Sequence, residues 1–64
     1  MTAEALKNLP DSCRIHLGLL KSDYSNDYKK DETRVRISSY LEALRDSGVI
    51  TEVEKRALFC YYTL

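Results

Sequence analysis

The segment Leu41-Glu-Ala-Leu44-Arg-Asp-Ser-Gly48-Val-Ile-Thr51-Glu-Val-Glu54 contains the signal that ends one helix and the signal that begins the next. Gly48 has no Cβ and can take the left-handed conformation that closes a helix. Thr51 and Glu54 have the spacing of a capping box, in which each side chain binds the other residue's backbone amide. The sequence therefore predicts two helices joined by a short turn over residues 34–64.

Two further helices are expected before this pair. The first should begin at Thr2 and end near Asn8 and Leu9, because the residue before Pro10 is disfavoured in helical conformation. The second should begin just after Pro10, since proline suits the start of a helix.

Residues 12–22 fit two structures. The spacing of a helical face is met by Cys13, His16, Leu17 and Leu20, whereas the alternation of a strand is met by Cys13, Ile15, Leu17 and Leu19. We favour a helix because no convincing second strand lies nearby to pair with it. The polar residues 22–32 are predicted to form a loop anchored to the core by Tyr24 and Tyr28, and a helical turn over 24–30 stays open as an alternative.

These segments predict an all-α fold in a single domain over residues 1–64. It should be a small bundle of three to four short helices that ends in an antiparallel helical hairpin, with the long helix before Gly48 beginning near Asp31 to Thr33. The predicted core consists of Leu17, Leu20, Ile37, Leu41, Leu44, Val49, Val53, Ala57 and Cys60.

Composition limits the classes of function. The chain has 64 residues, of which 10 are basic and 10 acidic, so it lacks the positive charge of a general nucleic-acid binder. No apolar run approaches the length of a membrane span, and the first residues do not resemble a signal peptide. We therefore expect a cytoplasmic protein with no membrane partner.

Catalytic and metal-binding groups are sparse. Cys13 and Cys60 are expected to be reduced thiols, and together with the single His16 they cannot supply the usual ligands of a zinc site. His16 has no nucleophile or paired acid at a suitable spacing. We expect no catalytic residues, no metal and no cofactor, and hence no enzyme.

The last helix carries more apolar surface than a chain of this size can cover. After Arg56 the sequence runs Ala-Leu-Phe-Cys-Tyr-Tyr-Thr-Leu without a charge. A helix that is apolar all round is normally buried on all sides. We therefore expect a small non-enzymatic interaction or regulatory protein that is homodimeric or bound to a protein partner. The expected contact residues are Leu58, Phe59, Tyr61 and Tyr62.

Residues 41–58 resemble the helical hairpin of SHOCT-type domains. The likeness rests on Leu41-x-x-Leu44-Arg-Asp-Ser-Gly-Val-Ile-Thr-Glu-x-Glu-Lys, since those domains carry a similar run before their second helix. The resemblance implies the helical hairpin and no particular activity. The aromatic run Phe59-Cys60-Tyr61-Tyr62 departs from the pattern of these domains.

A second resemblance supports an alternative function. Residues 37–44, followed by Gly48-Val49-Ile50, are similar to the recognition helix and first wing strand of winged-helix domains. The resemblance implies a returning strand over 56–64 and a transcriptional regulator that binds DNA. The basic residues near the helix start would then contact phosphates, and the candidate nucleic-acid contacts are Arg34, Arg36, Ser38 and Ser39.

Overall fold

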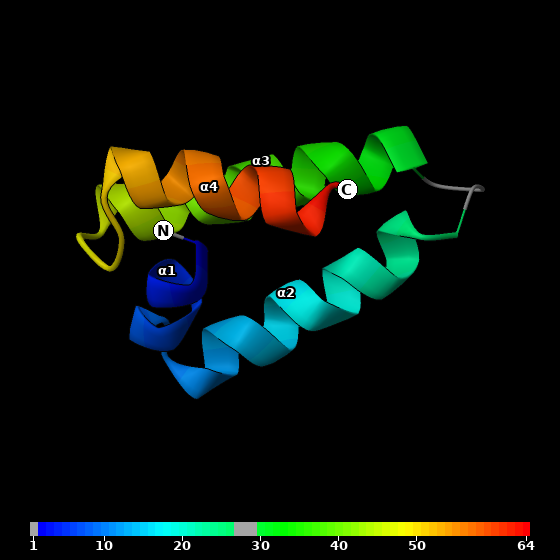
Figure 1. Ribbon diagram of the computed structural model, residues 1–64. Helices are drawn as coiled ribbons and strands as arrows, with labels where there is room; N and C mark the ends of the chain where they lie inside the picture. Colours follow the sequence, from blue (N-terminus) through cyan, green and yellow to red (C-terminus); the bar gives the residue numbers. More distant parts are fainter. Residues whose placement is uncertain (1, 27–29) are drawn as a thin grey trace.

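The structure is a computed structural model that describes residues 2–26 and 30–64. This part of the chain forms four helices and no strand: α1 (Thr2–Asn8), α2 (Asp11–Tyr24), α3 (Lys30–Asp46) and α4 (Glu52–Tyr62). The predicted all-α class is therefore confirmed. Figure 1 shows α4 running back alongside α3, with α1 close to the start of α4 and α2 extending away from α1.

Pro10 separates the first two helices as its chemistry predicts. α1 ends at Asn8, and the carbonyl of Pro10 accepts hydrogen bonds from the amides of Cys13 and Arg14 at 3.0 and 3.1 Å, which starts α2. Residues 12–22 are helical throughout, so the favoured alternative is confirmed.

The predicted loop over 22–32 is shorter than expected. α2 continues to Tyr24, whose side chain is buried, and α3 already begins at Lys30. Tyr24 follows Leu17 and Leu20 at helical spacing and so extends the buried face of α2 by one turn. Tyr28, the other expected anchor, lies outside the described residues.

The turn between α3 and α4 has both of its predicted motifs. Gly48 has a φ of +83°, and the amides of Val49 and Gly48 donate to the carbonyls of Leu44 and Arg45 at 2.9 and 3.0 Å. These are the two hydrogen bonds of a Schellman ending. The Thr51 amide donates to the Glu54 carboxylate at 2.8 Å, and the Glu54 amide donates to the Thr51 hydroxyl at 3.1 Å, which completes the capping box.

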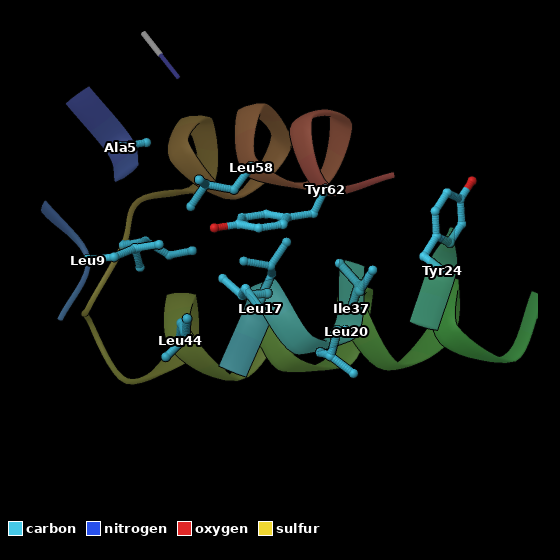
Figure 2. Packing of buried hydrophobic residues seen from close by; sticks show 11 residues of the cluster. Ala5, Leu9, Leu17, Leu20, Tyr24, Ile37, Leu44, Leu58 and Tyr62 are labelled. Carbon is cyan, nitrogen blue, oxygen red and sulfur yellow. The ribbon is translucent and has the colours of Figure 1, made fainter. Parts of the chain in front are cut away.

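The four helices enclose one core. α3 packs against both α2 and α4, α1 packs against α4, and α2 touches α4 more lightly. The buried apolar residues come from every helix and from the turns: Ala5, Leu9, Leu17, Leu20, Tyr24, Ile37, Leu41, Leu44, Ile50, Leu58 and Tyr62 (Figure 2). The radius of gyration is 10.9 Å, against about 10.7 Å for a compact chain of this length.

The core prediction was right for α2 and α3 and wrong for the turn residue Val49 and for α4. Leu17, Leu20, Ile37, Leu41 and Leu44 are buried, but Val49, Val53 and Cys60 are exposed and Ala57 is only half-buried. Two apolar stripes run along α4, and the one with the larger side chains faces inward. In Figure 2 Leu58 and Tyr62 project from α4 towards Leu17. Their bulk fills the space that small Ala57 and Cys60 would leave empty.

Replacement of each glycine by alanine should have opposite effects on stability. Gly48→Ala should destabilise the fold by about 1 kcal/mol, because alanine disfavours a positive φ. Gly18→Ala is the matched control: Gly18 lies inside α2, with open space where the added methyl group would stand, so it should stabilise by about 0.5–1 kcal/mol. Thermal unfolding followed by circular dichroism measures both, and a change of the same sign in the two variants would contradict the roles assigned to the two glycines.

Shortening single side chains on the two faces of α4 should have different effects on stability. Leu58 is fully buried, so Leu58→Ala should cost about 2–5 kcal/mol, enough to unfold a domain of this size. Val53→Ala removes a side chain that is 54% exposed and should change stability by less than about 0.5 kcal/mol. Urea titrations of both variants would test the assignment, and equal losses would show that the two faces have been misassigned.

Candidate functional site

The outward face of α4 is the candidate site. It carries Val53, Ala57 and Cys60, and Leu64, which lies just past the end of the helix, continues their spacing along the sequence. We call these four residues the outer stripe. Val53 is 54% exposed, Cys60 is exposed, and Leu64, which follows the C-cap Thr63, is 88% exposed. The stripe contains no charged residue, although it faces solvent.

A groove between α3 and α4 borders one side of the outer stripe. It has a volume of about 370 Å³ and is lined by Ser38, Leu41, Lys55, Arg56, Phe59 and Cys60. Phe59 is half-buried in this groove, and Cys60 belongs to both the groove and the stripe. The apolar surface of α4 therefore continues sideways from the stripe towards α3.

Tyr61 borders the other side. The residue is 39% exposed, and its ring meets the ring of Tyr62 edge-on, with 5.0 Å between centroids. The ammonium group of Lys21, from α2, lies 5.4 Å from the centre of the Tyr61 ring and donates to the Tyr61 carbonyl at 3.2 Å. Lys21 thus satisfies a carbonyl in the last turn of α4, where the helix dipole favours a positive charge.

The four predicted contact residues do not share one surface. Phe59 and Tyr61 reach the surface, on opposite sides of the outer stripe, whereas Leu58 and Tyr62 are buried in the core. The expectation that Leu58 and Tyr62 are exposed was therefore wrong. The sequence prediction placed Val53, Ala57 and Cys60 of the outer stripe in the core instead, because both sets of residues repeat at the same helical spacing.

The candidate nucleic-acid contacts are divided between two sides of α3. Ser38 lines the groove with α4, while Arg36 and Ser39 line a groove with α2. Arg36 is paired with Glu32 at 2.9 Å, and Arg34 donates to the Tyr24 hydroxyl at 3.4 Å. The returning strand implied by the winged-helix resemblance is helical over Arg56–Tyr62.

Two titratable side chains, His16 and Tyr40, lie side by side in the groove between α2 and α3. The rings of His16 and Tyr40 lie 4.4 Å apart. A hydrogen bond with the Cys13 thiol, followed by burial, raises the pKa of Tyr40 to about 12. The raised pKa disfavours a role of the phenol as a base, and the contacts of Tyr40 with Cys13 and His16 join α3 to α2.

Glu52 is the centre of an ion-pair network at the α3–α4 turn. Arg45 donates to its carboxylate at 2.6 Å, Arg56 donates at 2.9 Å, and the Lys55 ammonium lies at 3.3 Å. The hydrogen bond from Arg45 contributes most to lowering the pKa of Glu52 to about 2. Because Lys55 and Arg56 are both paired with Glu52, the α3–α4 groove does not present two free cations to an anion.

The described residues contain no group of three or more His, Cys, Asp or Glu side chains arranged to hold a metal ion. Among the same residues, no helix has the length and apolar character needed to cross a membrane. Comparison with known proteins gives no match, whether to a family model, to a curated protein or to a solved structure. The site must therefore be interpreted from its own chemistry.

The Glu52 network should make stability depend on pH. A carboxylate whose pKa is lowered from 4.5 to about 2 stabilises the fold above pH 4.5, and this contribution is lost as the pH falls from 4.5 to 2. The melting temperature of Glu52→Gln should therefore fall less than that of the wild type between pH 5 and pH 2. Glu42→Gln, at an exposed position of α3, is the control and should follow the wild-type curve. Identical profiles for all three proteins would contradict the role of Glu52.

Proposed function

We propose that this chain is a small non-enzymatic interaction or regulatory module that binds another protein chain through the outer stripe of α4. The observation that carries the proposal is that α4 has two apolar faces, one buried in the core and one exposed. Leu58 and Tyr62 are buried by the chain itself, and yet the opposite side of α4 also carries an uncharged row, Val53, Ala57 and Cys60, over about two turns. Aligned apolar surface of this kind is typical of a protein-interaction site.

The stripe is available on the folded single chain. The accessible surface is 4328 Å², close to the roughly 4,200 Å² typical of a monomeric protein of this mass. The core therefore needs no partner to close it. A partner would instead cover a surface that the finished fold leaves open.

Other exposed apolar residues form smaller groups. Ile15 and Leu19 lie one turn apart on α2, and Val35 is exposed on α3. Isolated exposed apolar side chains are common on soluble proteins and do not mark a site. The outer stripe differs because three positions aligned on α4 and the following Leu64 have Phe59 and Tyr61 at their sides. Aromatic residues of this kind are enriched at interface centres.

Site-specific photo-cross-linking would test this proposal. A photoreactive amino acid replaces Val53 in the full chain, expressed in its native cells, and the matched control places it at Val35, a valine on α3 that is 64% exposed. We expect a discrete protein adduct from position 53 and none from position 35. Adding Cys60→Glu should reduce adduct formation, since a charge at the centre of an apolar interface weakens binding by roughly 30-fold or more. Equal adducts from both positions, or none from position 53, would overturn the proposal.

A further inference from the structure

The outer stripe has the same pattern when read in either direction. In the sequence its larger side chains, Val53 and Leu64, lie at the two ends, with Leu64 just past the last turn of α4, and its smaller ones, Ala57 and Cys60, lie in the middle. A two-fold axis through the point between residues 58 and 59 would pair Val53 with Leu64 of a second copy and Ala57 with Cys60. A symmetric dimer requires a self-complementary surface of this kind.

We propose that the outer stripe binds the outer stripe of a second copy of this chain, with the two α4 helices antiparallel. This inference rests on the proposed function and names the partner. Val53, Ala57 and Cys60 follow one another on α4 at four and three residues, the spacing at which two helices interlock side chains along a common seam. Leu64 extends the row just beyond the end of the helix. Small residues at the centre of the seam let the two backbones approach closely, because interaxial distance depends on the side chains at the contact.

Charge favours the antiparallel arrangement over the parallel one. The first turn of α4 carries Glu52 and Glu54, and Lys21 lies against its last turn beside Tyr61. Glu54 and Tyr61 are seven residues apart and share one side of the helix. Antiparallel pairing brings Lys21 of each copy towards Glu54 of the other and opposes the two helix dipoles. Parallel pairing would place the acidic first turns side by side.

The size of the surface predicts a weak dimer. α4 has 11 residues and is about 16 Å long, so a contact along it buries less than the roughly 800 Å² per partner of a standard stable interface. Phe59 and Tyr61 extend the contact at its sides. We expect a dissociation constant of about 1 μM to 1 mM and hence an equilibrium that depends on protein concentration.

Sedimentation equilibrium on the purified full chain tests the second copy directly. The average mass should rise from that of the 7.4 kDa chain towards twice that value as the concentration rises. Val53→Glu should keep the chain monomeric, and Val35→Glu, the matched substitution on α3, should leave the wild-type curve unchanged. Circular dichroism confirms that each variant is folded. A monomer at all concentrations up to about 1 mM, or equal loss of dimer in both variants, would overturn the inference.

Disulfide trapping tests the orientation. One chain carries Cys13→Ser and keeps only Cys60; the other carries Cys13→Ser, Ala57→Cys and Cys60→Ser and is labelled with ¹⁵N. When the two are mixed and oxidised with diamide, antiparallel pairing should yield mainly the mixed disulfide between positions 57 and 60, because those Cα atoms face each other. Predominant homodimeric disulfides would show parallel pairing and overturn the proposed arrangement.

The two proposals fail in different ways. If photo-cross-linking at position 53 captures a protein of another mass while the purified chain stays monomeric, self-association is wrong and the interaction function stands. If position 53 yields no adduct, the interaction function itself is wrong.

Discussion

The turn over Ser47–Thr51 is the constraint on which the rest of the structure depends. Gly48 ends α3 at a fixed residue, and the capping box begins α4 three residues later. This leaves little freedom in how α4 is rotated about its own axis. The capping box holds Glu54 in place. Leu58 and Tyr62 come four and eight residues after Glu54 and therefore lie on nearly the same side of α4. The Arg45–Glu52 ion pair joins the two helices across the same turn. The turn thus decides which stripe of α4 enters the core.

A chain of 64 residues can cover α4 on only part of its circumference. α3 packs along it on one side, α1 lies against it, and α2 touches it more lightly, with Lys21 contacting Tyr61 near its end. Within the described residues, no further element remains to cover Val53, Cys60 and Leu64. α4 is therefore both a core helix and a surface helix, and the outer stripe on its surface side contains no charged residue. The apolar excess read from the sequence is real, but it lies on the opposite face from the one expected.

The sequence predicts where the helices begin and end better than it predicts which side of each helix is buried. Gly48, Thr51 and Glu54 act through local backbone chemistry, so the turn could be derived from three residues. The extension of α2 to Tyr24 was missed because polar residues around it suggested a loop, although Tyr24 continues the spacing of Leu17 and Leu20. The stripes of α4 share one periodicity, so spacing alone could not rank them. Side-chain volume carried the missing information, since a core is filled to high density and Leu58 and Tyr62 fill it better than Ala57 and Cys60.

The same difference in volume bears on the role of the outer stripe. Polar side chains at Val53 and Leu64 would leave the core unchanged, because both residues project mostly into solvent. The packing of the single chain therefore does not account for the apolar character of this face. Small residues between two larger ones make a shallow seam, poor for filling a core but suited to the close approach of another helix. Physical chemistry thus assigns the two faces of α4 to two tasks: the bulky face holds the chain together, and the flatter one is shaped to meet a second helix.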